Sequence, residues 1–445
     1  MYKGAMETAL TKQIWLRGFG RLAIANIVSN LMVPLAGLID TAFLGHLADI
    51  RHLAGVALAT VLFNVIYWSF GFLRMGTSGL VAQAVGRGDR AEQWRVGLRG
   101  LSIALVLGLT ILVLQTPLRL VGFAILRAEP SVLESGLAFY QGRILGAPAV
   151  LMNYVLLGWF LGMGRGRRVF VLAVVGNGTN ILLDYWMIVR LGWESYGAGL
   201  ATALSQYAML LLGMLLLARS LPWQQIWQQR FTLWSRQAVG SLFRLNRDIM
   251  VRSWALLLSF GLFTNISGLM GTEILAVNTL LLQALMLVSN FLDGIAFATE
   301  TYAGQFYGQG DRSRLRALAT VGGGMSLGLG MGVAIALITF PQSIFGLLTD
   351  HQAVLTQLNR YVLWLLPLFS FGAISFMFDG YFLGLTASHI LRNSTVRATL
   401  FGFAPLAAIA YALRSPHLLW LAMIGFMAIR ALTLVRAVPA SLKPS

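Results

Sequence analysis

Long apolar segments recur along the whole chain, and they constrain the fold more than any other feature. Examples are Leu101 to Leu114, Leu204 to Ala218 and Ser326 to Phe340. A helix needs about 20 mostly apolar residues to cross the hydrocarbon core of a bilayer. Only 11% of the 445 residues are charged, which is too few to cover a water-facing surface. The sequence therefore predicts an all-α integral membrane protein with about twelve transmembrane helices.

The boundaries of the apolar segments define the expected spans. An outer-membrane barrel is disfavoured because its strands would alternate apolar and polar residues. The first apolar segment leads directly into the fold, so no cleaved signal peptide is expected. The chain has no cysteine, which excludes disulfides and thiolate metal sites. The predicted spans are 21–45, 57–82, 98–120, 139–163, 169–190, 197–219, 250–270, 274–302, 318–342, 360–385, 396–413 and 417–437.

The net charge of +17 is distributed unevenly between alternate loops. Most of the Lys and Arg residues fall on one side when the spans are threaded through a bilayer, which is the positive-inside pattern. This pattern predicts a multi-pass protein of the bacterial inner membrane with both termini in the cytoplasm. The basic charge is then explained by topology and by contact with anionic lipid, and no nucleic-acid partner is expected.

The two halves of the chain resemble each other at a fixed offset of 222 residues. In the longest match, five of nine positions are identical. The offset predicts two six-helix bundles that run in the same direction, as parallel repeats about an axis along the membrane normal. Such a pair favours alternating access, although a duplication of purely structural meaning is the alternative. The aligned segments are Ala82–Arg90 with Gly304–Arg312, Leu53–Ala54 with Leu275–Ala276, and Gly158–Gly162 with Gly380–Gly384.

The repeat also predicts the domain boundaries. Residues 1–221 form the expected N-terminal lobe and residues 247–445 the expected C-terminal lobe. The segment 222–246 between them is rich in Trp, Gln and Arg, which is typical of a linker at the cytoplasmic interface.

Five acidic residues fall within the predicted spans, where a charge costs about 2.5–3.5 kcal/mol at the bilayer centre. They are expected to face a bundle interior or an aqueous cavity, unless they lie close enough to a helix end to reach the interface. These acids are Asp40, Asp184, Asp293, Glu300 and Asp379.

One helix face in the fifth span carries a stripe of polar residues, Asn177, Asn180 and Asp184, at spacings i, i+3 and i+7. Two carboxyl groups in an apolar pocket can hold a proton near neutral pH. The same oxygen ligands could instead hold sodium, at Asp40, Asn180, Asp184 and Thr202. An amide ladder that only joins helices is a further alternative. The predicted ion-coupling pocket comprises Asp40, Asn153, Asn177, Asn180, Asp184 and Thr202.

A hinge is predicted in the first span. Pro34 removes a backbone donor and Gly37 adds flexibility just before Asp40. Protonation of Asp40 could then be coupled to bending of the helix, whereas a static kink is the structural alternative.

The basic residue Arg74 falls deep in the second span and aligns with Ala296, between Asp293 and Glu300. We expect a cytoplasmic gate in which Arg74 pairs with one of these acids across the two halves. Bonding of Arg74 to backbone carbonyls of its own half is the alternative.

Several motifs are absent from the sequence. There is no Walker A motif for ATP, no metal-ligand spacing among the five histidines and no catalytic constellation. We therefore expect a protein that is not an enzyme and has no metal or cofactor, driven by an ion gradient with a proton or sodium as the coupling ion. A channel is disfavoured because it would more naturally be a symmetric oligomer.

Three segments carry a family resemblance: Pro34–His46, Arg74–Gln83 and Leu245–Arg252. They resemble the DinF branch of the multidrug and toxic compound extrusion (MATE) family. The resemblance implies two six-helix bundles and antiport of small organic, often cationic, compounds against protons or sodium. It also implies a monomer in which Asp40 couples ion and drug movement with Asn180, Asp184, Asn153 and Thr202.

The sequence departs from the sodium-coupled relatives of the NorM branch. These relatives carry an acid in the seventh helix, where the present span has none, although Asp379 resembles their acid in the tenth helix. A proton is therefore the preferred coupling ion. A lipid or lipid-linked precursor flippase is the other alternative; it is disfavoured because Arg74 is the one basic residue expected deep in a span.

Overall fold

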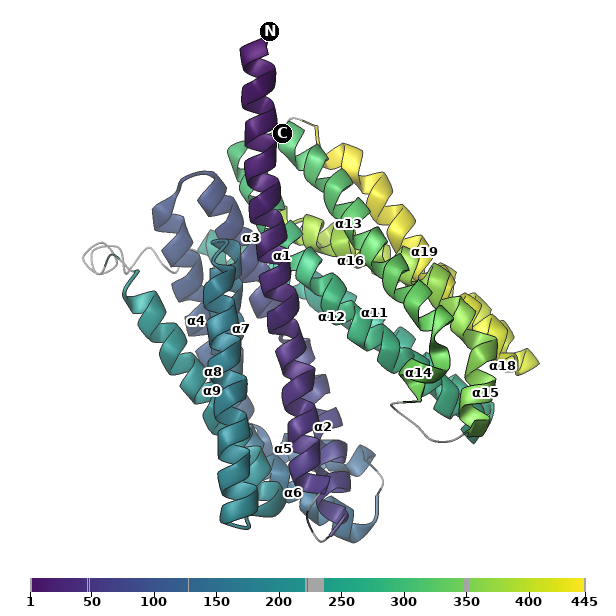
Figure 1. Ribbon diagram of the computed structural model, residues 1–445. Coiled ribbons are helices and arrows are strands. Elements are labelled where there is room, and N and C mark those ends of the chain that lie inside the picture. Colours follow the sequence, from purple (N-terminus) through teal and green to yellow (C-terminus); the bar gives the residue numbers. More distant parts are fainter. Residues whose placement is uncertain are drawn as a thin grey trace. The chain divides into compact units, whose positions relative to one another are not determined.

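The computed structural model describes a chain of helices joined by short turns, and no strand occurs among the described residues (Figure 1). It covers residues 2–443 except 46, 48, 127, 221, 223–235 and 347–351. Most of the predicted linker 222–246 therefore lies outside the described residues.

The described residues cluster into two compact units. The amino-terminal unit comprises Val28–Phe243, and it holds the second part of α1 together with the helices up to α9. These helices are α1 (Tyr2–Gly45), α2 (Arg51–Ser69), α3 (Phe72–Gly86), α4 (Arg90–Val113), α5 (Gln115–Ile125), α6 (Pro130–Ile144), α7 (Ala147–Gly162), α8 (Gly166–Asp184), the π-helix η1 (Tyr185–Arg190) and α9 (Glu194–Ala218).

The carboxy-terminal unit comprises Arg244–Ser445 together with Met1–Ile27. Its core lies between α12, α13, α16 and α19, where apolar side chains such as Phe369 and Trp420 are fully buried. The helices are α11 (Arg236–Leu269), α12 (Thr272–Gln309), α13 (Arg312–Thr339), α14 (Pro341–Phe345), α15 (Gln352–Tyr361), the 3-10 turn η3 (Val362–Trp364), α16 (Leu365–Gly384), α17 (Ser388–Arg397), the π-helix η4 (Ala398–Phe403), α18 (Ala404–Leu413) and α19 (Pro416–Ser441).

The number of membrane spans agrees with the prediction. Eleven helical spans in the described part of the chain are long and apolar enough to cross a bilayer, and a bent helix pair raises the number to 12. The bent pair is α6 and α7, whose axes differ by 55°. The predicted span 139–163 is therefore not one continuous helix. Pro148 at the start of α7 has no N–H to donate to α6, which explains the break after Ile144.

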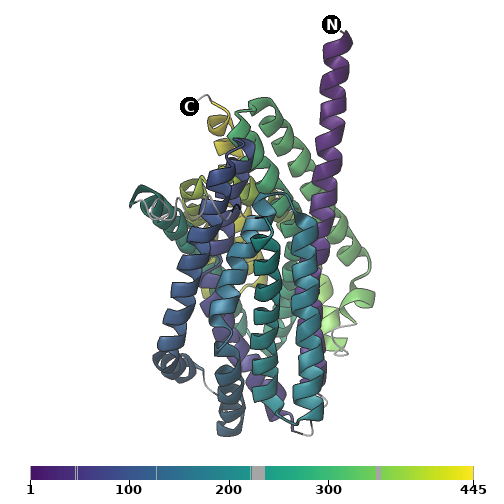
Figure 2. The ribbon, with the colours of Figure 1, turned by 90° about the vertical axis from the view of Figure 1, so that its left-hand side faces the viewer.

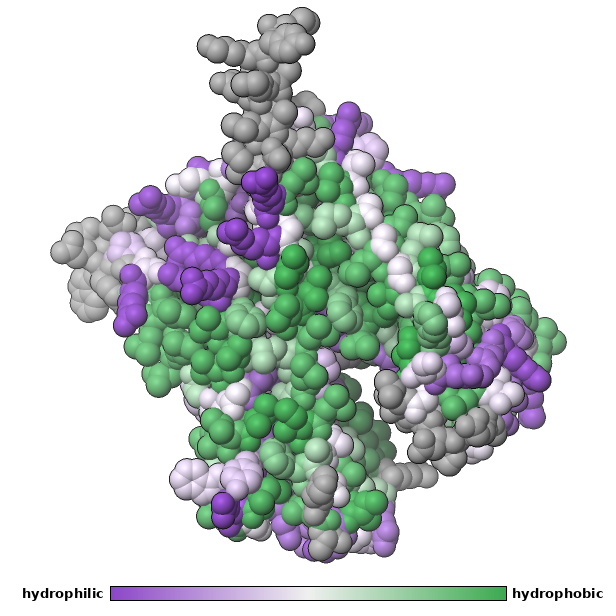
Figure 3. All heavy atoms as spheres, viewed as in Figure 1, coloured by the Kyte–Doolittle hydropathy of each residue, from purple (hydrophilic) through white to green (hydrophobic). Residues whose placement is uncertain are grey.

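Apolar side chains cover the outer faces of the helices, as Figure 3 shows for one face. Leu38, Leu182 and Phe401 are 67%, 71% and 71% exposed, respectively. A water-soluble protein rarely exposes such large contiguous apolar surfaces. These surfaces fit the hydrocarbon of a bilayer, so the all-α membrane fold is confirmed.

The internal repeat is visible in the packing of glycines. A Cβ added at Gly158 would lie 2.3 Å from the carbonyl oxygen of Arg74, and one at Gly380 would lie 2.1 Å from that of Ala296. Both pairs keep the offset of 222 residues. The equivalent turns are also capped alike, because Asp89 accepts from the N–H of Glu92 and Asp311 accepts from that of Arg314. The two halves are thus related by the predicted repeat.

The helix α1 contributes to both units. In its first part, the rings of Trp15 and Phe19 pack against Tyr302 of α12, with centroids 6.5 and 5.9 Å apart. The amino-terminal end of α1 and the carboxy-terminal end of α19 lie at the same end of the carboxy-terminal unit (Figures 1 and 2). The boundary of the N-terminal lobe at residue 1 stays a prediction, and the structure adds this contact to it.

Candidate functional site: a carboxyl pair in the amino-terminal unit

Two acidic side chains from different helices meet inside the amino-terminal unit. Asp40 lies near the end of α1 and Asp184 is the last residue of α8, and their carboxyl groups are hydrogen-bonded to each other. The side-chain amide of Asn180, one turn earlier in α8, donates to Oδ2 of Asp184 over 2.8 Å. Two carboxylates at this distance cannot both be ionised, so the pair must hold a proton when it forms this hydrogen bond.

A buried arginine lies beside the carboxyl pair. Arg143 on α6 interacts electrostatically with Asp40. Its guanidinium lies 4.8 Å from the ring centre of Phe63 and 5.4 Å from that of Phe139, and Nη1 donates to the hydroxyl of Thr60 over 3.4 Å. Stacking on aromatic rings holds a guanidinium in place. The arginine can therefore stabilise Asp40 when that carboxyl loses its proton.

The other predicted pocket residues bond elsewhere. The amide of Asn153 donates to the side-chain oxygen of Gln206 over 3.0 Å and to the Gln206 carbonyl over 2.9 Å. Asn177 donates to the carbonyl of Ala173 in its own helix over 2.8 Å. The hydroxyl of Thr202 donates to the carbonyl of residue 198 over 2.9 Å. In this conformation the carboxyl pair thus has Asn180 as its amide partner, and the three other polar side chains bond elsewhere.

The helix geometry changes directly after the carboxyl pair. The π-helix η1 begins at Tyr185, the residue after Asp184, and the ring of Tyr185 packs 6.4 Å from that of Phe43 on α1. π-Helical turns inside α-helices occur frequently at functional sites, because they shift the direction of the side chains that follow. Here the turn lies where α8 contacts α1.

The predicted hinge lies within a continuous helix. α1 runs through Pro34 without interruption, and Gly37 is exposed. The hydroxyl of Thr41 donates to the Gly37 carbonyl over 2.8 Å, a bond that often accompanies bending of a helix. Bending of α1 on protonation of Asp40 stays a prediction.

The predicted gate residues belong to different units. Arg74 lies on α3 of the amino-terminal unit, where it interacts electrostatically with Tyr154. Asp293 and Glu300 lie on α12 of the carboxy-terminal unit, and Glu300 is fully buried. Pairing of Arg74 with either acid stays a prediction.

A second charged cluster, which we call the arginine–aspartate triad, lies inside the carboxy-terminal unit. Arg252 of α11 and Arg430 of α19 both donate to Oδ2 of Asp379 on α16. All three side chains are buried, and Asp293 adds an attractive interaction with Arg430. Removing one member of such a group strands the charge of another in a medium of low dielectric constant.

The triad corrects one expectation from the sequence. Arg74 is not the one basic residue deep in a span, because Arg143, Arg252 and Arg430 also lie inside the helical units. All three fall in otherwise apolar helices, and this composition was the available signal. The spacing along the chain could not show their partners, because each pairs with a residue of another helix.

The fold and the paired carboxyls together define a class: multi-pass membrane transporters built from a duplicated helical lobe. The chain belongs to the MatE family, whose model matches residues 25–186 and again residues 249–409. The two matches coincide with the two halves of the internal repeat.

Known relatives support this membership over almost the full length. The chain is 36% identical to DNA damage-inducible protein F of Escherichia coli K12, covering 97% of this chain and 92% of the relative. It is 26% identical to a probable multidrug resistance protein NorM of Thermotoga maritima, covering 79% of this chain and 76% of the relative.

Solved structures show the same fold. An outward-facing MATE family multidrug resistance transporter aligns with a TM-score of 0.86 at 22% identity, over 96% of both chains. A MOP superfamily transporter from Pyrococcus furiosus aligns with a TM-score of 0.85 at 21% identity, over 96% of both chains.

Proposed function

We propose that the protein is a proton-coupled antiporter that exports organic, often cationic, compounds across the bacterial inner membrane, with both termini in the cytoplasm. The observation that carries this proposal is the hydrogen-bonded carboxyl pair of Asp40 and Asp184. The names of the relatives, which include multidrug resistance proteins and a DNA damage-inducible protein, support export of toxic compounds.

The pair supplies a simple coupling step. When the shared proton leaves, two negative charges repel each other at the contact between α1 and α8, and Arg143 offsets part of that repulsion. The contact then has two arrangements with different charge, which is what a proton-driven two-state transporter requires. A cationic compound and a proton would compete for the same pair of carboxyls, so uptake of one favours release of the other.

Sodium is the second candidate for the coupling ion, since carboxylate and amide oxygens suit a hard cation. Two contacts favour the proton. Thr202 bonds within its own helix, and the amide of Asn180 presents its N–H, not its oxygen, to Asp184. A flippase is the third candidate; the buried arginines of the carboxy-terminal unit would serve it only if they were open to an anionic lipid, whereas two of them bind Asp379.

Transport by inverted membrane vesicles tests the proposal. A proton gradient without sodium should drive uptake of a fluorescent organic cation, and Asp40→Asn should abolish it while the protein remains folded. Asp49→Asn, the same change at the exposed partner of Arg51, is the matched control and should transport normally. A strict requirement for sodium would replace the proton in the proposal, and normal uptake by Asp40→Asn would reject the carboxyl pair.

The remaining parts of the proposal concern partners. The protein acts as a monomer, with small organic molecules and lipid as its contacts, and needs no cofactor beyond the coupling ion. Alternating access of the two units, with Arg74 as a gate, completes the transport cycle.

A further inference from the structure

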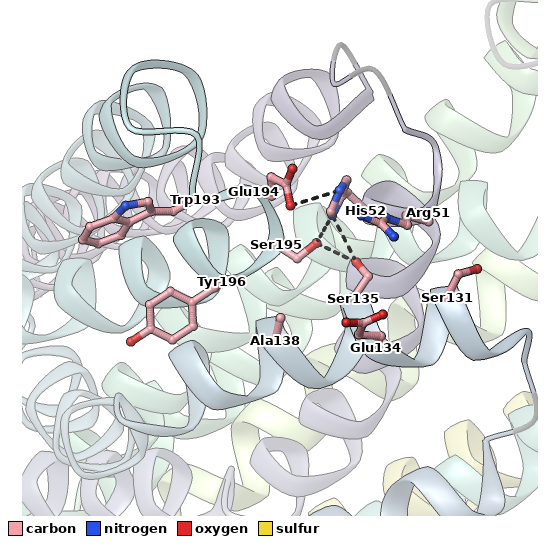
Figure 4. A pocket seen from close by; sticks show the side chains of 10 residues that line it. All are labelled: Arg51, His52, Ser131, Glu134, Ser135, Ala138, Trp193, Glu194, Ser195 and Tyr196. Carbon is pink, nitrogen blue, oxygen red and sulfur yellow. Dashed lines mark hydrogen bonds and ion pairs between the residues drawn. The ribbon is translucent and has the colours of Figure 1, made fainter.

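A buried histidine forms a polar cluster at one end of the amino-terminal unit (Figure 4). His52, in the first turn of α2, places Nδ1 3.0 Å from the hydroxyl of Ser195 on α9 and Nε2 3.2 Å from a carboxylate oxygen of Glu194. The hydroxyl of Ser135 on α6 lies 2.6 Å from that of Ser195. The cluster therefore joins three helices through one imidazole ring.

The cluster is built into the packing of the helices. The side chains of His52, Ser135 and Ser195 are 5%, 5% and 1% exposed, whereas Glu194 is half exposed. A Cβ added at Gly55 would lie 2.5 Å from the hydroxyl of Ser135, so α2 and α6 approach each other closely beside the histidine. These contacts hold His52 at a fixed distance from both hydroxyls.

The turn before α9 is strained at the histidine's partner. Glu194 adopts a φ of +47°, in the left-handed region that side chains other than glycine rarely occupy. Backbone strain of this kind persists only where surrounding contacts impose it, and it is often found at functional sites. The contact with His52 is one such constraint.

The hydroxyl groups allow the cluster to satisfy both forms of the imidazole. An ionised carboxylate only accepts hydrogen bonds, so Nε2 carries the hydrogen that faces Glu194. In neutral His52, Nδ1 accepts from Ser195, which in turn accepts from Ser135. When a proton binds, Nδ1 donates to Ser195, and the Ser195 hydroxyl rotates to donate to Ser135. No heavy atom has to move.

The surrounding charges favour the protonated form. The groups that face His52 are Arg51 of α2, Glu134 of α6 and Glu194 of α9, which also line a cavity of about 160 Å³ beside the cluster. Arg51 is bound by Asp49 over 3.0 Å, so its charge is compensated locally. The two glutamates remain, and opposite charge nearby stabilises an imidazolium.

We propose that this cluster is a second proton-binding site of the amino-terminal unit, distinct from the Asp40–Asp184 pair, and that proton uptake by His52 tightens the attachment of α2 and α6 to α9. Imidazole changes its charge between about pH 5 and 8. Acidification therefore turns the contact with Glu194 into an ion pair and stabilises the first turns of α2 and α9. In the proposed topology this end faces the outside, where the protons enter.

Hydrogen exchange on the purified full-length protein tests the proposal without any transport. After correction for intrinsic exchange, amides in the first turns of α2 and α9 should exchange about fivefold more slowly at about pH 5.5 than at about pH 7.5. In His52→Gln the pH response should disappear, because glutamine keeps hydrogen-bonding capacity but does not titrate. Glu194→Gln should lose most of the response as well.

Two controls separate this site from other effects of pH. His389→Gln removes an exposed histidine in the carboxy-terminal unit and should keep the full response. Asp40→Asn, which tests the proposed transport function, should also keep it even though export is lost. No response in the wild-type protein, or an unchanged response in His52→Gln, would overturn the proposal.

Discussion

At the scale of single residues, the structure uses buried arginines in two different ways. Arg143 stacks on Phe63 and Phe139 beside a carboxyl pair that must gain and lose a proton. Arg252 and Arg430 both bind one oxygen of Asp379. The first arrangement can tolerate a change of charge, whereas the second has its charges fixed by direct ion pairs.

Replacing Arg143 by methionine should therefore change the pH dependence of export more than the stability of the fold. Without the guanidinium, the ionised form of Asp40 loses an attraction that is worth on the order of 1 kcal/mol, so export should require a pH higher by about one unit. The pH profile of transport in vesicles measures the shift. Arg190→Met, at an exposed arginine, should leave the profile in place; an unshifted profile for Arg143→Met would remove Arg143 from the coupling step.

The triad predicts the opposite behaviour for Asp379. Asp379→Asn should lower the free energy of unfolding by about 3–5 kcal/mol, because two buried arginines lose their common counter-ion. The triple variant Arg252→Met, Asp379→Leu, Arg430→Met should recover most of that stability. Thermal unfolding in detergent measures both, and export by the stable triple variant shows that the triad is structural. A stable triple variant without export would instead place Asp379 in transport.

At the scale of helices, the closest contacts are made through glycines that recur at the repeat offset. α3 approaches α7 at Gly158, and α12 approaches α16 at Gly380, in each case against a backbone carbonyl. Backbone atoms cannot move aside as flexible side chains can. These two helix pairs are thus rigid parts of the units, in contrast to α1, which passes through a proline and an exposed glycine.

Gly158→Ala and Gly380→Ala should each lower the melting temperature by several degrees, because the added methyl group would overlap a carbonyl oxygen. Gly178→Ala, on α8, meets nothing within 4 Å and should be neutral or slightly stabilising, since alanine is the better helix former. Melting curves of the three variants, measured in the same detergent, provide the comparison. Equal melting temperatures for all three would contradict the close packing of these helices.

Prediction from sequence succeeded where a single chain segment carries the signal. Apolar length located the spans, and the spacing of Asn180 and Asp184 placed them on one face, where the structure brings them to Asp40. The partners of Arg143 and His52 lie on other helices, so no spacing along the chain could reveal them. The break between α6 and α7 was legible at Pro148 but was outweighed by the length of the apolar segment.

At the scale of the whole molecule, transport needs a contact that differs between two states of the two units. Arg74 and the acids Asp293 and Glu300 share a depth by the repeat, and they carry opposite charges. Exchanging them provides the test: Arg74→Glu alone should lose export, and Arg74→Glu with Asp293→Arg or Glu300→Arg should regain it. Loss of export in both double variants, with normal amounts of folded protein, would exclude the gate.

The first helix belongs to one unit at its start and to the other at its end. A chain cut between residues 222 and 235 would therefore give an amino-terminal fragment whose first 27 residues pack on the carboxy-terminal fragment, so the two pieces should reassemble when co-expressed. The same arrangement bears on ancestry. If each repeat descends from a single six-helix protein, the sharing of α1 resembles a swapped dimer, in which each copy lent the start of its first helix to its neighbour before the two genes were fused.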